Sequence, residues 1–254
     1  MRKPTTPLAI FALVFGGAAC APDAPSPTAI DETAGFKRER ATPALASDAT
    51  VAVFQELLAA TNEALATEGA VYRAFAVEYL TSGENAEVGR DVVFKDVGNK
   101  HLTFGPGFPE ADLVPGDARR VWDVPDFNTI TYALDQVDPE TVSGLPIGAT
   151  SAAIDRAMDI WDAQTCSGGL SIERNPDFGL DIGVLAFQVF GGAPGLGSPF
   201  VFADVQHAGW ELGFAVAPNT IAFTVTFAFV DGMGNLTDLD GNGRIDVAFR
   251  EIYY

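Results

Sequence analysis

The residues whose spacing best suits a defined chemistry lie near the C-terminus, where side chains that carry oxygen ligands recur at every second position. The segment matches the pattern D-x-D-x-N-G-x-x-D, the front of a calcium-binding loop, and it reads Asp238-Leu239-Asp240-Gly241-Asn242-Gly243-Arg244-Ile245-Asp246. In such a loop Asp238, Asp240 and Asn242 supply side-chain oxygens as the first three ligands. Arg244 then supplies its backbone carbonyl, and Asp246 binds directly or through water. The sequence therefore predicts a calcium site in this segment.

A second interpretation of the same segment stays open. The loop position where an EF-hand needs a bidentate glutamate is Phe249, and Glu251 comes two residues too late. The preceding residues alternate like a strand, so the segment is not a helix-loop-helix hand. The alternative is a turn rich in Asp, Asn and Gly whose side chains bond their own backbone. Asp231 lies just upstream and would add negative charge in either case.

The charge of the 254-residue chain limits the partners that it can have. It carries 15 Lys and Arg residues against 34 Asp and Glu residues, for a formal net charge of −19. Such a protein repels phosphate backbones and anionic lipids, which disfavours nucleic-acid binding and direct membrane binding. Two cysteines exclude a disulfide-dense scaffold, and two histidines exclude a metal site that needs three.

The first 20 residues predict export. A short basic start precedes an apolar run over residues 8–15 that is too short to cross a bilayer, so residues 1–19 are predicted to be a signal peptide. The residues Gly17-Ala18-Ala19-Cys20 resemble a bacterial lipobox, in which Cys20 becomes lipidated. The protein would then be a cell-envelope lipoprotein, held at the membrane only through its lipid; ordinary cleavage and secretion is the alternative. Residues 20–46 contain four prolines and predict a flexible linker.

The rest of the chain predicts an α+β protein with a mixed sheet and packed helices. A proline-rich boundary near residue 117 separates a small accessory unit, residues 47–117, from a second unit, residues 118–254. Helices are predicted from residue 47 or 48 to about 67, and from 150 or 151 to about 164. The buried stripe of the second helix is expected to be Ile154, Ala157, Met158 and Trp161, with Asp155 and Asp159 in solvent. Strands are predicted at 71–80, 92–97, 129–134, 170–172, 180–190 and 221–230.

Three pieces of the second unit occur in an order that resembles the matrixin-like zinc metallopeptidases, a branch of the metzincins. They are a strand with an I-T-Y core, a helix with the pattern A-I-x-x-A-x-x-x-W, and a segment close to A-D-I-x-I. In this chain they read Asn128-Thr129-Ile130-Thr131-Tyr132-Ala133-Leu134, Ala153–Trp161, and Leu180-Asp181-Ile182-Gly183-Val184. The resemblance covers about residues 118–254, and it implies the fold of the N-terminal part of a metzincin catalytic domain after a helix-plus-hairpin unit.

The resemblance ends before the family's catalytic motif. Metzincins hold Zn²⁺ with H-E-x-x-H-x-x-G-x-x-H on a helix, where the glutamate acts on the metal-bound water. The 254 residues end at Arg250-Glu251-Ile252-Tyr253-Tyr254 without it, which we interpret as a truncation, a frameshift or a degenerate copy. The chain is therefore expected to be inactive, with Zn²⁺ and a polypeptide substrate belonging to an intact relative. The missing helix is expected to leave Phe223 and Phe227 exposed.

A possible structural zinc site also follows from the resemblance. The stretch Phe202–Trp210 is similar to the loop where matrixins carry a structural-zinc histidine, which makes His207 and Asp204 the candidate ligands. The family's companion H-x-D pair is absent from this chain. A histidine that is packed or hydrogen-bonded beside Trp210 is the other interpretation.

The sequence thus leads to two functional expectations from different classes. The first is an exported, matrixin-like zinc metalloendopeptidase family member that is inactive as these 254 residues. The second is a non-catalytic, calcium-stabilised surface lipoprotein that binds a protein partner. A folded monomer whose melting temperature rises with calcium would favour the second.

Overall fold

The structure is a computed structural model, and it describes residues 44–45, 48–81, 87–92, 102–103, 129–137, 144–164, 171–177, 179–209, 216, 220–238 and 245–254. The predicted signal peptide, Cys20 and nearly all of the predicted 20–46 linker lie outside these residues. None of the helices in the described part of the chain combines the length and the apolar character that a bilayer crossing requires.

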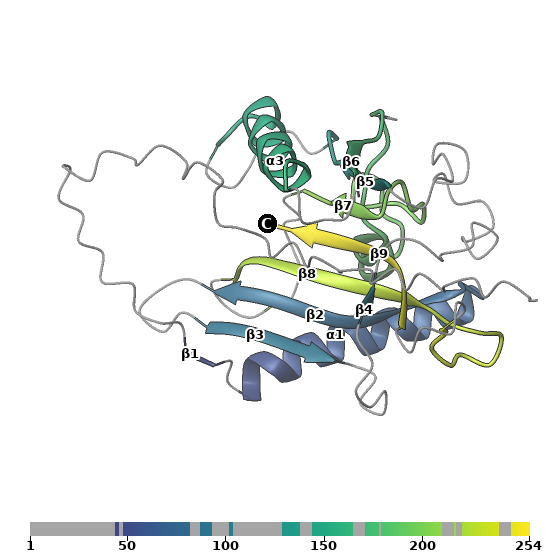
Figure 1. The fold of residues 1–254 in the computed structure, drawn as a ribbon. Coiled ribbons are helices and arrows are strands. Elements are labelled where there is room, and N and C mark those ends of the chain that lie inside the picture. Colours follow the sequence, from purple (N-terminus) through teal and green to yellow (C-terminus); the bar gives the residue numbers. More distant parts are fainter. Residues whose placement is uncertain are drawn as a thin grey trace, which may run out of the picture. The chain divides into compact units, whose positions relative to one another are not determined.

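A mixed β-sheet organises the described residues (Figure 1). Its strands are β1 (Ala44–Leu45), β2 (Tyr72–Thr81), β3 (Glu87–Val92), β4 (Leu102–Thr103), β5 (Thr129–Leu134), β6 (Ser171–Arg174), β7 (Val205–His207), β8 (Thr220–Phe229) and β9 (Ile245–Tyr253). Within the described ranges their order is β1-β3-β2-β8-β9-β7-β5-β6, and β4 pairs with β9. The neighbours β6, β5, β7 and β9 run parallel, whereas β8 is antiparallel to both β9 and β2. The predicted α+β class with a mixed sheet is therefore confirmed.

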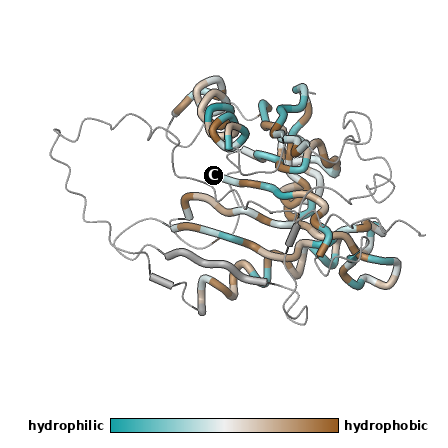
Figure 2. The backbone as a smooth tube through the Cα atoms, viewed as in Figure 1, coloured by the Kyte–Doolittle hydropathy of each residue, from teal (hydrophilic) through white to brown (hydrophobic). Residues whose placement is uncertain are grey.

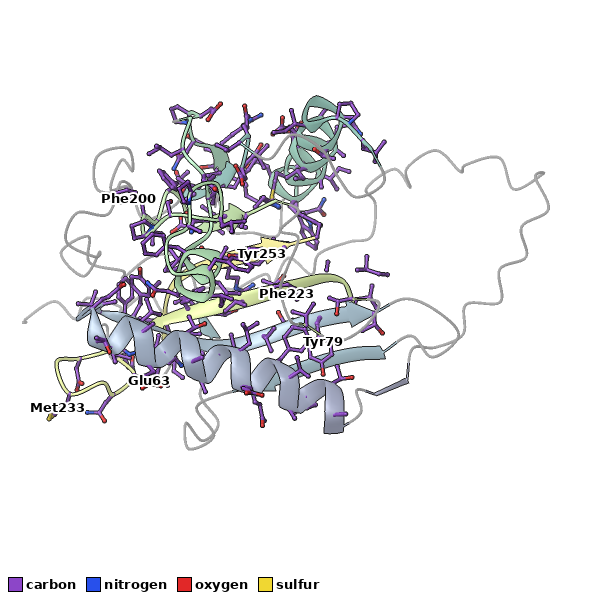
Figure 3. All side chains as sticks on the ribbon, turned by 180° about the vertical axis from the view of Figure 1, so that it is seen from behind. Glu63, Tyr79, Phe200, Phe223, Met233 and Tyr253 are labelled. Carbon is purple, nitrogen blue, oxygen red and sulfur yellow. The ribbon has the colours of Figure 1, made fainter. Side chains whose placement is uncertain are left out.

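The first helix covers one face of this sheet. The helix α1 (Asp48–Thr67) has the predicted bounds, and its Phe54 and Leu58, one turn apart, are fully buried. The ring of Phe54 stacks on Tyr79 of β2 with centroids 4.3 Å apart. Figure 3 shows α1 lying across the strands, with Tyr79, Phe223 and Tyr253 toward its side of the sheet.

The expectation that Phe223 and Phe227 would be exposed is wrong. They are only 5% and 0% exposed, because β8 turns both rings toward the face that α1 covers. Phe54 contacts Phe223 at a centroid distance of 5.6 Å, and Tyr72 of β2 meets Phe227 edge-on at 5.9 Å. The N-terminal helix thus covers the face that was expected to lack a helix, and Tyr72 of the neighbouring strand packs beside Phe227.

One sheet joins the two predicted units. The strand β2 from residues 47–117 pairs with β8 from residues 118–254, and Val77 lies opposite Val225. The register shifts between Ala74 and Ala76, which marks a β-bulge in β2. At this bulge the Asn62 amide of α1 donates to the Ala74 carbonyl (2.9 Å) and accepts from the Ala74 N–H (2.7 Å). A side chain of the helix therefore provides the hydrogen bonds that the irregular strand needs.

The second helix, α3 (Ile147–Asp162), begins three or four residues earlier than predicted. Pro146 precedes it with an extended ψ of 149°, and Thr150 lies within the first turn, where its hydroxyl donates to the Ile147 carbonyl. Hydrophobic and hydrophilic residues alternate along α3 in Figure 2, yet none of its residues is buried. Trp161, expected in the buried stripe, is 67% exposed. The buried-stripe prediction is therefore wrong, although the helix itself is confirmed.

The predicted buried strand over residues 180–190 is also wrong. Residues 180–183 lack regular structure, and Val184–Phe190 form the short helix α4. Gly183 (φ 145°) and Gly191 (φ 67°) bracket this helix in conformations that other residues rarely adopt. A short apolar run fits a buried strand and a buried helix equally well, so periodicity could not separate them.

The remaining strand predictions differ mainly in their bounds. The strands at 71–80, 129–134 and 221–230 correspond to β2, β5 and β8, and the short strand at 170–172 corresponds to β6. The partner of β2 is not 92–97 but β3, which ends at Val92, and residues 93–97 lie outside the described part. The strands β1, β4, β7 and β9 were not predicted.

Candidate functional site

The predicted calcium segment follows β8 and leads into β9. A tight turn over residues 231–235 comes first, closed by the Asp231 N–H donating to the Asn235 carbonyl (2.8 Å). Met233 at its tip is 85% exposed and labelled in Figure 3. Farther along, the Asp246 N–H donates to the Thr237 carbonyl at 3.3 Å. This bond closes the base of the segment and brings its two ends together.

Asp231 has a structural part in the first turn. One oxygen of its carboxylate accepts from the backbone N–H groups of Met233 (2.8 Å) and Asn235 (2.9 Å), and both oxygens accept from the Asn235 amide. These hydrogen bonds, chiefly those from Asn235, lower the pKa of Asp231. The Asp231 carboxylate thus accepts hydrogen bonds from the backbone of its own turn, as in an Asx-turn.

The structure describes only two of the five predicted calcium ligands. Asp246 is 2% exposed at the start of β9, and Asp238 is half-buried near the base of the segment. Asp240, Asn242 and Arg244 lie outside the described residues. The calcium site therefore stays a prediction.

His207 belongs to a second polar group, at the carboxyl ends of the parallel strands β5, β7 and β9. Its ring is 4% exposed, and Nδ1 lies 2.6 Å from the hydroxyl of Tyr254, just beyond β9. Among the described residues Nε2 is buried and has no hydrogen-bond partner. Burial lowers the pKa of His207 to about 4, while the negative charge of Asp155 opposes this. The imidazole is therefore neutral at pH 7, with one nitrogen held and the other unbonded.

The helix α3 contributes to the same group through Asp155. Tyr132 of β5 donates its hydroxyl to one oxygen of Asp155 (2.9 Å), and Arg174 of β6 donates to the other (2.8 Å). Burial and Asp155 together raise the pKa of Tyr132 to about 12. The sequence placed Asp155 on a solvated face, whereas the carboxylate ties α3 to two strands. The sequence signal that could have indicated this contact is an acidic residue on the helix followed by Arg174 in the next strand.

The two candidate zinc ligands have different hydrogen-bond partners. Asp204 lies before β7, and its Oδ2 accepts from the backbone N–H (2.8 Å) and the hydroxyl (2.9 Å) of Thr131 in β5. His207 instead contacts Tyr254 and the edge of the Tyr132 ring. Within the described ranges, no three His, Cys, Asp or Glu side chains are grouped so that they could hold a metal. The structural zinc site stays a prediction.

A buried network that the sequence did not predict centres on Glu251 of β9. Its carboxylate is 0% exposed and accepts from the N–H groups of Val184 (2.6 Å) and Leu185 (2.9 Å), which open α4. The Gln206 amide and the Tyr253 hydroxyl also donate to it, each at 2.9 Å. Desolvation raises the pKa of Glu251, and the four donors oppose that rise. The buried carboxylate thus links the first turn of α4 to β9 of the sheet.

One signal in the sequence could have identified Glu251. It stands between Phe249 and Tyr253 at every second residue, so all three side chains share the core face of β9. A charged residue in such a position is rare unless hydrogen-bond donors surround it. The sequence does not show where those donors come from.

Comparison of the chain with models of protein families, with curated proteins and with solved structures gave no match.

Proposed function

We propose that this chain is an exported member of the matrixin-like zinc metalloendopeptidase family, and that these 254 residues do not hydrolyse peptides by themselves. The observation that carries the proposal is the order of the I-T-Y and A-I-x-x-A-x-x-x-W segments. The first lies in β5 and the second on α3, so both have the element type that the resemblance implies. The third segment, Leu180–Val184, departs from it, because it leads into α4 rather than forming a strand.

The residues of this chain do not fit a catalytic zinc ion of that family. Such a site needs three histidines, and the chain has only His101 and His207. His207 is buried in β7, and His101 lies outside the described residues. We therefore assign no catalytic residues and derive no reaction step for this chain.

The first experiment is to sequence the native transcript for about 80 codons beyond the Tyr254 codon, in all three frames. Finding H-E-x-x-H-x-x-G-x-x-H would support a peptidase whose catalytic helix is absent from the present chain. A stop codon with no such motif in any frame would contradict a truncated or frameshifted peptidase and would mean a domain that has lost its active site, which favours the calcium-stabilised binding protein.

A second experiment addresses activity directly. The purified 254-residue protein should not cleave casein, with or without added Zn²⁺. Cleavage that EDTA abolishes would overturn the expectation that this chain is inactive.

The alternative function, a calcium-stabilised surface lipoprotein that binds a protein partner, is favoured by the closed base of the segment between Thr237 and Asp246. A ligand that binds only the folded state stabilises it by about 1.4 kcal/mol at ten times its Kd. Under this alternative, millimolar calcium raises the melting temperature, and the substitutions Asp238→Asn and Asp246→Asn abolish the rise. Asp159→Asn, which removes an exposed charge from α3, is the matched control. A rise that survives both loop substitutions would exclude the predicted site.

Anchoring through Cys20 is part of both functions and can be tested separately. Expressed in a bacterial host, the chain should incorporate labelled palmitate, and Cys20→Ala should release it into the soluble fraction. Incorporation that persists in Cys20→Ala would contradict lipidation at this residue.

A further inference from the structure

Residues 181–203 form a segment that leaves the sheet and returns to it, and we call this segment the excursion. It begins before α4, continues through a glycine-rich segment over 191–199 and ends shortly before β7. Its first residue contacts the glycine-rich segment, because the Ser198 hydroxyl donates to the Asp181 carbonyl at 2.7 Å. The excursion therefore has internal contacts of its own.

The glycine-rich segment packs directly against the start of α4. A Cβ atom on Gly197 would lie 2.1 Å from the Gly183 carbonyl oxygen and 2.7 Å from the Phe187 nitrogen, so only glycine allows this approach. A Cβ atom on Gly192 would lie 2.8 Å from the Phe187 ring. Because helix and segment are this close, neither can move far without the other.

The excursion depends on β9 for its first helical turn. The short helix α4 has no side-chain cap of its own. Three consecutive N–H groups, of Val184, Leu185 and Ala186, instead find acceptors on Glu251 and on the hydroxyl of Tyr253. The end of the excursion joins the same network indirectly, since the Phe202 N–H donates to the Gln206 side chain, which bonds Glu251.

We propose that residues 181–203 open and close as one cooperative unit, with the Glu251 contacts as their latch, while the β2-β8-β9 part of the sheet stays folded. Three features favour such an opening. A seven-residue helix has little stability in isolation. Four glycines with positive φ, Gly191, Gly192, Gly195 and Gly197, gain conformational entropy when the segment is released. A buried carboxylate regains its hydration when the helix leaves.

The β2-β8-β9 part of the sheet shares one hydrophobic core with residues 181–203 but differs from them in its backbone pairing. Its strands are nine or ten residues long and pair along their length. Its core face carries aromatic stacks such as Phe227 on Phe249, with centroids 4.4 Å apart. A short helix with a glycine-rich segment and a set of long paired strands are expected to open with different free energies in native-state hydrogen exchange.

The test is native-state hydrogen exchange of the full chain at increasing, sub-denaturing urea. The amides of Phe187, Gly192 and Phe202 report on the unit without bonding Glu251 themselves. We expect these three to share one opening free energy and one urea dependence, both smaller than those of the β2-β8 amides. Exchange of all three only through global unfolding, or with three unrelated urea dependences, would overturn the proposal.

Two substitutions test the latch. Glu251→Gln replaces one acceptor oxygen by a donor NH₂ group with little change of shape, and we expect Phe187, Gly192 and Phe202 to exchange at least about tenfold faster. Tyr253→Phe removes a single hydroxyl and should give a smaller common increase, about threefold. It also carries the test if Glu251→Gln does not fold. Faster exchange of Val184 and Leu185 alone would show a local cap rather than a latch.

The matched control is Glu63→Gln. Glu63 is an exposed glutamate on α1, labelled in Figure 3, and the same chemical change there should leave all three reporter amides unaltered. An equal acceleration in Glu63→Gln would mean that any loss of negative charge opens the unit, which would refute a specific role for Glu251.

Discussion

On one face of the sheet, α1 places the fully buried Phe54 and Leu58 against aromatic rings of β2 and β8. On the other, α3 buries none of its residues and is held by hydrogen bonds from Tyr132 and Arg174 to Asp155. Side chains alternate between the faces of a strand, so Tyr132 lies opposite its core neighbour Ala133. Two amphipathic helices of one chain thus contact the same sheet in different ways.

The difference shows which contacts carry the stability of the fold. Burying one large apolar side chain contributes about 1.5–3 kcal/mol, and α1 buries several. An ion pair whose side chains are each one-third exposed, such as Arg174 with Asp155, contributes about 0–1 kcal/mol. The α1 face should therefore dominate the free energy of unfolding, while the polar contacts of α3 determine where that helix lies.

The largest expected effect separates the two helices directly. Phe54→Ala should lower the free energy of unfolding by about 3–5 kcal/mol, because it opens a cavity under α1. Trp161→Ala, on the 67% exposed ring of α3, should change it by less than about 0.5 kcal/mol. Urea denaturation of both variants measures the contrast. Equal losses would mean that α3 is as well packed as α1.

The next effect concerns the buried histidine on the α3 face. The folded pKa of His207, about 4, lies below its ordinary value, so the unfolded chain binds a proton first as the pH falls. Stability should therefore drop between pH 6.5 and pH 4, by about 3 kcal/mol for this group. The difference in unfolding free energy between wild type and His207→Gln isolates the contribution of His207 from that of the other titrating groups. A difference that stays constant over this pH range would contradict a neutral, buried imidazole.

A smaller effect is expected at the bulge of β2. Asn62→Ala removes both hydrogen bonds to Ala74 and should lower the free energy of unfolding by about 1–3 kcal/mol. Glu63→Ala, next to it but exposed, is the control and should stay within about 0.5 kcal/mol of wild type. If the two variants unfold at the same urea concentration, the bulge does not depend on α1.

The smallest effect is the coupling between Asp155 and Arg174. A double-mutant cycle with Asp155→Asn and Arg174→Gln should give about 0.2–1 kcal/mol, and 1 M salt should reduce it. Chemical denaturation at low and high salt provides both values. A coupling above about 2 kcal/mol would place this pair among buried ion pairs and reverse the contrast between the two faces.

Periodicity predicted the long elements correctly, since α1, β2 and β8 each repeat their apolar residues over ten or more positions. Periodicity failed where the apolar run is short, and where the apolar positions do not identify the partner surface. The apolar run over 180–190 fits strand and helix alike, and the apolar positions of α3 do not show that its partner surface is polar.

The sequence by itself determined the α+β class, the strong negative charge, the lack of a third histidine and the aspartate-rich segment between β8 and β9. These follow from residue types and from periods that local sterics impose. Only the tertiary structure decided that α1 packs on the face that carries Phe223, that Tyr72 packs beside Phe227, that His207 contacts Tyr254, and that Glu251 accepts from the amides of α4. The reason is that burial and hydrogen bonding join residues that are far apart in the chain, and no local pattern records which of them will meet.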